Sequence, residues 1–158
     1  MRLRGLLLAA GILLATGCGS DSTGPNGGSE PTYENIADTY VGVLAGNAQG
    51  IVLEASFSIT IQQSAGDLTG SWSMTGTLND GVIIVPIQGT GSLTGTINSG
   101  QNPSLSITTR SATCPNLESS FSGSYDSVNR IITISGPIQI VDDCVPVITY
   151  QSTIVLGR

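Results

Sequence analysis

From Tyr33 to the C-terminus, apolar side chains alternate with serine and threonine in successive short runs. The clearest run is 68–78, where Leu68 and Trp72 fall on one face and the other face carries only serine and threonine. Because side chains of a β-strand point alternately to opposite faces, this spacing is typical of strands with one buried face. No segment shows the spacing of an amphipathic helix, and only residues 34–38 could hold a helical turn. The alternation therefore predicts an all-β domain.

Turn signals divide this domain into about eight strands with short connections. Asn79-Asp80-Gly81 favours a hairpin, because Asp-Gly supplies the positive φ of a type I′ turn. Pro86 cannot donate to a β-ladder, so it marks an edge, a bulge or a break. We expect strands at 39–45, 51–63, 68–78, 82–97, 104–110, 120–126, 130–140 and 148–156.

Glycines on the apolar face favour a barrel over a sandwich. These residues are Gly70, Gly76, Gly89, Gly91, Gly95 and Gly123. Glycine weakens a flat strand but suits a strand that must coil sharply, as in a small closed barrel. The opposite face is polar but nearly uncharged, which gives little protection against edge pairing, and closure removes the edges. We therefore expect an eight-stranded antiparallel up-and-down barrel, with a β-sandwich as the alternative.

Three of these runs resemble strands of the calycin group of up-and-down barrels, the streptavidin-like ones in particular. The matching residues are Phe57–Ile61, Leu68–Trp72 and Phe121–Tyr125, followed by a terminal strand that ends in Arg158. The resemblance implies the barrel fold for most of residues 38–158. It implies no biotin site, because that pocket needs several tryptophans and this chain has only Trp72.

The first eighteen residues have the order of a secretory signal. Arg2 and Arg4 precede an apolar run at 6–15, which at about half of the roughly 20 residues of a membrane span is too short for one. Ala15-Thr16-Gly17-Cys18 resembles the lipobox of bacterial lipoproteins, which implies cleavage after Gly17 and acyl chains such as palmitate on Cys18. The alternative is an ordinary signal peptide that happens to precede a cysteine.

These features divide the chain into a signal peptide (1–17), a lipidated N-terminus with a flexible linker (18–32) and a β-barrel domain (33–158). The linker is rich in glycine, serine and proline and has no large apolar side chain. Gly19 follows the cysteine where an aspartate would imply retention in the inner membrane. We therefore expect a lipid-anchored cell-envelope protein, in the outer membrane, with membrane lipid as its partner through acylated Cys18.

Charge and cysteine content exclude several classes of partner and site. Without residues 1–17 the chain keeps three arginines against eleven acidic residues, a net charge of −8, and it has no lysine or histidine. A nucleic-acid partner needs a basic surface, so none is expected. Cys114 and Cys144 form an even pair in an oxidising compartment, which predicts a disulfide, with two buried thiols as the alternative. No metal and no cofactor are expected, since no histidine accompanies the cysteines.

The same composition argues against an enzyme. Without histidine and lysine, Ser-His-Asp, Cys-His and Ser-Lys sites are impossible. A carboxylate-based hydrolase is a distant alternative, because Asp142 and Asp143 are adjacent and would point to opposite faces of a strand.

Two non-enzymatic interpretations remain. Low aromatic content favours a structural or interaction role in the envelope, with an envelope protein as partner. The alternative is a binding module that holds a small apolar ligand inside the barrel, where Trp72, Phe57 and Phe121 are the interior candidates. A wide apolar cavity near Trp72 would favour the binding module, and a filled interior would favour the interaction role.

Overall fold

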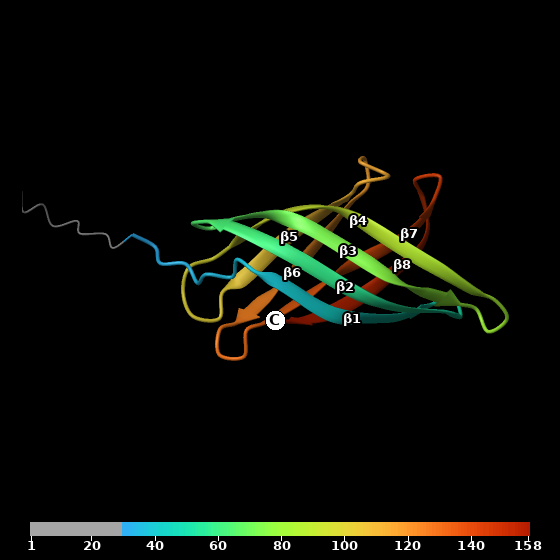
Figure 1. Cartoon of the computed structure of the whole chain (residues 1–158), viewed down its shortest axis with the longest axis horizontal. Coiled ribbons are helices and arrows are strands. Elements are labelled where there is room, and N and C mark those ends of the chain that lie inside the picture. The colour runs from blue at the N-terminus through green and yellow to red at the C-terminus, as the bar shows by residue number, and fades with distance from the viewer. Residues whose placement is uncertain (1–29) are drawn as a thin grey trace, which may run out of the picture. The chain divides into compact units, whose positions relative to one another are not determined.

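The computed structural model describes residues 30–158, which form a closed barrel of eight antiparallel strands in sequence order (Figure 1). Each strand pairs with the next one along the chain, and β1 pairs with β8. The predicted all-β, up-and-down barrel is therefore confirmed, and the sandwich alternative is wrong. The strands are β1 (Thr39–Ala48), β2 (Ile51–Ser64), β3 (Asp67–Asn79), β4 (Ile84–Ile97), β5 (Ser104–Ser111), β6 (Glu118–Asp126), β7 (Ile131–Asp142) and β8 (Val145–Gly157).

Alternate residues of the strands point into the barrel interior, as the two-residue spacing predicts. The predicted inward residues Phe57, Ile59, Leu68, Leu93, Ile107, Phe121 and Ile134 are all buried. Trp72 also packs against this core, but it is only partly buried. The barrel exterior carries the serine and threonine side chains, so the polar face is the solvated one.

Two hairpins extend several strands beyond the bounds expected from the sequence. Gln49 and Gly50 have φ of 54° and 81°, and Asp143 and Cys144 have φ of 46° and 63°. Positive φ at both central residues is the signature of a two-residue type I′ turn. At Asn79-Asp80-Gly81 the expected type I′ turn is wrong, because β3 and β4 are joined by a four-residue loop, 80–83, in which only Gly81 has positive φ.

Several inward glycines stand where neighbouring strands approach too closely for a side chain. A Cβ atom at Gly70 would lie 1.9 Å from the Thr60 carbonyl oxygen, and one at Gly123 would lie 1.8 Å from the Thr133 carbonyl oxygen. No Cβ can occupy such a position without moving the backbone. These glycines therefore permit the sharp coiling of a small barrel, as expected.

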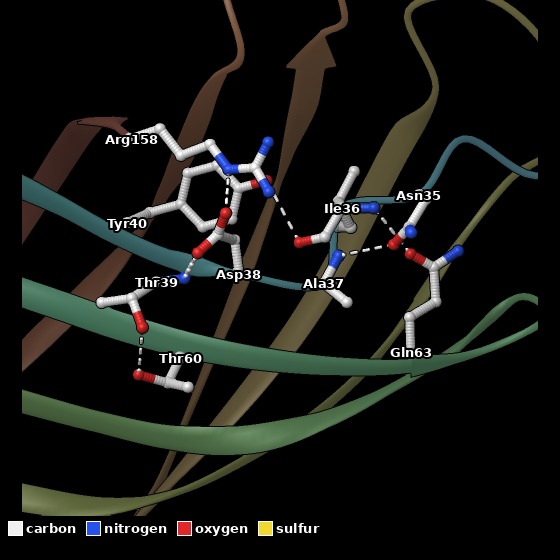
Figure 2. A network of polar contacts seen from close by, with 9 residues as sticks. All are labelled: Asn35, Ile36, Ala37, Asp38, Thr39, Tyr40, Thr60, Gln63 and Arg158. Carbon is white, nitrogen blue, oxygen red and sulfur yellow. Dashed lines mark hydrogen bonds and ion pairs between the residues drawn. The ribbon is translucent and has the colours of Figure 1, made fainter.

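The segment before β1 packs against one end of the barrel, and Figure 2 shows polar contacts that hold it there. The Ile36 side chain is fully buried, and its backbone N–H donates to Gln63 Oε1 at 2.8 Å. The Gln63 amide in turn donates to the Glu34 carbonyl, and the Tyr40 hydroxyl donates to the Ile36 carbonyl at 3.1 Å. The helical turn considered for 34–38 is absent, because these bonds to β1 and β2 hold the segment in a non-helical conformation. We call residues 33–38 the plug.

An ion pair fastens the plug to the last residue of the chain. Asp38 contacts the Arg158 guanidinium and also accepts a hydrogen bond from the Thr39 N–H at 2.6 Å. That backbone bond, with help from Arg158, lowers the pKa of the Asp38 carboxyl. The carboxylate therefore stays charged at neutral pH. In Figure 1 the plug and the C-terminus lie at the same end of the barrel, which we call the closed end.

Candidate functional site

A gap in the barrel wall opens at the opposite end because the hairpins differ in length. β5 and β6 have 8 and 9 residues, whereas β4 and β7 have 14 and 12. β5 therefore pairs with β4 only from Gly91 onward, and β6 pairs with β7 only as far as Ser135. Beyond these points the facing edges of β4 and β7 have no strand between them. We call this end of the barrel the mouth.

A cavity of about 400 Å³ lies in this gap. Its apolar wall comes from β2, β3, β4, β6 and β7 together with the β5–β6 loop. That wall consists of Phe57, Trp72, Met74, Pro86, Ile87, Leu117, Phe121, Ile138, Ile140 and Val141. The remaining lining residues are glycine, serine, threonine and glutamine, so no ionisable side chain of residues 30–158 lines the cavity. The cavity therefore suits a molecule without net charge, because an unpaired buried charge is costly.

Trp72 forms one wall of the cavity and is held from three sides. Its ring is stacked on Phe57, with centroids 6.1 Å apart and planes 22° apart. The indole N–H donates to the Arg110 carbonyl at 3.2 Å. Gly89 and Gly91 of β4 lie directly beneath the ring, where added Cβ atoms would come within 3.1 Å and 2.6 Å of it. These two glycines therefore make room for the indole as well as for strand coiling.

Hydroxyl and amide groups supply the polar part of the cavity. Thr109 is 8% exposed, and its hydroxyl donates to the Ser119 carbonyl at 3.3 Å. Gln88 and Gln139 line the two facing edges, and Gln88 is exposed at the mouth. These groups can exchange hydrogen bonds with one polar group of a ligand, while the aromatic wall contacts its apolar part.

The disulfide expected between Cys114 and Cys144 is present, with a Cα–Cα distance of 5.4 Å. It joins the β5–β6 loop to the turn between β7 and β8, so it crosses one side of the mouth. Thr113 and Leu117, on either side of Cys114, both line the cavity. The disulfide therefore fixes a lining segment that has no strand partner of its own.

The structure brings together the three interior residues proposed from the sequence. Phe57, Trp72 and Phe121 all line the cavity. Cys18 lies outside the described residues. Asp142 and Asp143 lie at the tip of the β7–β8 hairpin and do not line the cavity, so the cavity gives no support to a carboxylate hydrolase.

Sequence reasoning missed the lining residues of β4, β7 and the β5–β6 loop. A signal for them existed in the unequal lengths of the expected strands, since 104–110 and 120–126 are shorter than 82–97 and 130–140. Within residues 30–158 no cluster of acidic or cysteine residues could hold a metal ion. The same residues include no helix long and apolar enough to cross a membrane.

Comparisons of the chain with protein-family models, curated proteins and solved structures find no match.

Proposed function

We propose that this protein is a binding module that holds one small, neutral, largely apolar molecule in the cavity at the mouth. The observation that carries the proposal is the cavity itself. Its volume of about 400 Å³ lies within the range of roughly 300–1,000 Å³ that is common for small-molecule sites. A structural or interaction role, favoured by the low aromatic content, gives no reason for such a cavity, so the binding interpretation now ranks first.

The chemistry of the wall defines the ligand class. Stacked Phe57 and Trp72 offer a flat aromatic surface, and Ile138 and Ile140 face it from β7. Thr109 and the two glutamines can satisfy a single hydroxyl, carbonyl or amide group of the ligand. A molecule with an apolar body and one uncharged polar group fits this arrangement best, such as a fatty alcohol, a neutral lipid fragment or an aromatic amide.

In this proposal the module is also a lipoprotein of the cell envelope. The barrel geometry does not bear on the lipid anchor, so the anchor is tested separately, by labelling. Support for the anchor comes from the apolar run that ends in Ala15-Thr16-Gly17-Cys18. Support for ligand binding comes from the strand order, which is that of calycin-like barrels, because eight-stranded barrels of this group can hold one small ligand. Metabolic labelling with palmitate should mark the wild-type chain and leave the Cys18→Ser chain unmarked.

Ligand binding can be tested with a neutral fluorescent probe, N-phenyl-1-naphthylamine. Trp72 is the only tryptophan and lines the cavity, so energy transfer from Trp72 to the probe reports binding at this site. We expect saturable binding of one probe per chain. Native mass spectrometry of the purified protein tests for a retained natural ligand.

A matched pair of variants locates the probe. Ile140 and Ile148 are partners across the β7–β8 ladder and are both partly buried, but only Ile140 lines the cavity. Ile140→Glu should weaken probe binding at least about tenfold, because it places a charge in the cavity. Ile148→Glu should change binding less than about twofold. Absence of stoichiometric binding to the wild type, or equal loss in both folded variants, would overturn the proposal.

A further inference from the structure

The loop between β3 and β4 and the first residues of β4 project a run of exposed apolar side chains from the mouth. Val82, Ile83, Ile84 and Val85 are 89%, 59%, 65% and 48% exposed. We call residues 81–85 the finger. Such a concentration at the tip of a hairpin differs from single apolar residues scattered over a surface, which need no explanation.

The backbone N–H groups of this loop are all paired within residues 79–83. Asp80 Oδ1 accepts from the N–H groups of Val82 and Ile83 at 2.8 Å and 2.7 Å. The Gly81 N–H donates to Asn79 Oδ1 at 2.8 Å, and the Asp80 N–H donates to the Ile83 carbonyl at 3.3 Å. All four N–H groups of the loop 80–83 are therefore paired without water. Internal pairing is what a lipid environment demands of a polypeptide backbone, since no solvent is there to replace the bonds.

We propose that the finger inserts into the surface of a bilayer of neutral, zwitterionic lipid. The tip offers apolar side chains without cations, and Asp80 lies at its base, where its carboxylate can stay in the headgroup region. The acidic character of the domain opposes binding to anionic lipids. This inference goes beyond ligand binding in the cavity and is measured separately from it.

The size and place of the finger favour lipid over protein as the partner. A stable protein interface buries about 1,200–2,000 Å², far more than a five-residue tip can supply. The apolar surface also continues from the finger through Pro86 and Ile87 into the cavity wall. On the same end of the barrel, Val145 and Val147 of β8 are 62% and 53% exposed, next to the tip of the β7–β8 hairpin. Docking of the mouth on lipid would cover both hairpins.

Depth-dependent fluorescence quenching tests the inference in the full chain. The background is Cys18→Ser, which removes the expected acyl anchor, with Trp72→Phe, which removes the native tryptophan. Ile83→Trp then reports the finger. The matched control is Val43→Trp, because Val43 is an equally apolar β1 residue, 74% exposed on the barrel wall. Vesicles contain phosphatidylcholine brominated on its acyl chains.

We expect bromolipid to quench the Ile83→Trp chain at least about fivefold more strongly than the Val43→Trp chain. Replacing part of the phosphatidylcholine with equally brominated phosphatidylglycerol, so that the bromine content stays constant, should weaken this quenching. Equal quenching of the two chains overturns the inference, as does quenching that requires the anionic lipid. A concentration-dependent blue shift of the Ile83→Trp chain without vesicles also overturns it, because a second copy of the chain would then cover the finger.

Discussion

The closed end and the mouth of this barrel are built from the same eight strands, yet only one is filled. At the closed end the plug places Ile36 in the core beside Tyr40 of β1, and both side chains are fully buried. At the mouth Ile87 and Ile140 are only partly buried beside the cavity. The closed end has a segment of chain added to the strands, whereas the mouth lacks the strand length that would complete its wall. Alternation of apolar residues alone therefore builds a barrel but does not decide whether its interior is filled.

The largest difference in stability between the two ends should come from the same isoleucine-to-alanine substitution at each end. Ile36→Ala should lower the free energy of unfolding by about 4 kcal/mol, because it opens a cavity in a fully packed site. Ile140→Ala should cost about 1 kcal/mol, since its side chain already borders empty space. Urea denaturation of both variants measures the difference. Equal losses would show that the mouth is as tightly packed as the closed end.

Removal of the disulfide should affect the mouth more than the closed end. The Cys114→Ser/Cys144→Ser double variant loses a crosslink over a sequence separation of 30, about 3 to 4 kcal/mol in the chain-entropy account. We expect faster amide hydrogen exchange in residues 112–117 and 137–147. The Ile36 amide, bonded to Gln63, should stay protected in conditions where the protein remains folded. Faster amide exchange at Ile36 without faster exchange near the mouth would contradict the expectation that the disulfide stabilises the mouth more than the closed end.

Alanine substitutions at the two glycines beneath Trp72 should distinguish a glycine needed for strand coiling from one that makes room for the indole ring. Gly91→Ala should cost about 3 kcal/mol, because its Cβ would lie 1.9 Å from the Arg110 carbonyl oxygen and the backbone must move. Gly89→Ala should cost less than about 1 kcal/mol, because its Cβ meets only the far edge of the indole, at 3.1 Å. Thermal unfolding gives the costs, and Trp72 fluorescence should shift in the folded Gly89→Ala chain. Similar losses of stability in the two variants would show that the two glycines have the same role.

Acidification should produce the smallest loss of stability, and this loss should arise at both ends of the barrel. Backbone hydrogen bonds lower the pKa of Asp38 at the closed end and of Asp80 at the mouth. Since both pKa values in the folded protein lie below the ordinary aspartate value of about 3.8, the stabilisation is present above about pH 4 and is lost as the pH falls further. The chain has no histidine, so stability should change little between about pH 5 and 8. Denaturation curves over pH 2–8, repeated for Asp38→Asn and Asp80→Asn, test this. A midpoint that falls steeply between about pH 7 and 5 would contradict it.

Local sequence patterns were sufficient for the strands and the inward residues, because a two-residue period fixes which side chains face the core. They were also sufficient for the Cys114–Cys144 pairing. The plug could not be predicted, because its conformation depends on Gln63, which is 27 residues away from Ile36. The extent of β7 and β8 was underestimated, because Asp143 and Cys144 adopt positive φ in a turn that resembles no Asn-Gly or Asp-Gly signal. The cavity could not be predicted from any single segment, because it arises from the difference in length between hairpins that lie around a closed ring.

The way in which β1 closes the barrel has a mechanical consequence. β1 shares ten residue pairs with β2 but only three with β8, at Val41–Val43. A pull applied to the chain before the plug meets the hydrogen bonds of Glu34 and Ile36 to Gln63, then the Asp38–Arg158 ion pair, and then passes along β1. The short β1–β8 seam is therefore where the barrel should yield under load. No residue of β1 or β8 lines the cavity, and the seam lies across the ring from the pairing of β4 with β5. Tension on the N-terminal side would thus strain a part of the wall that does not line the cavity.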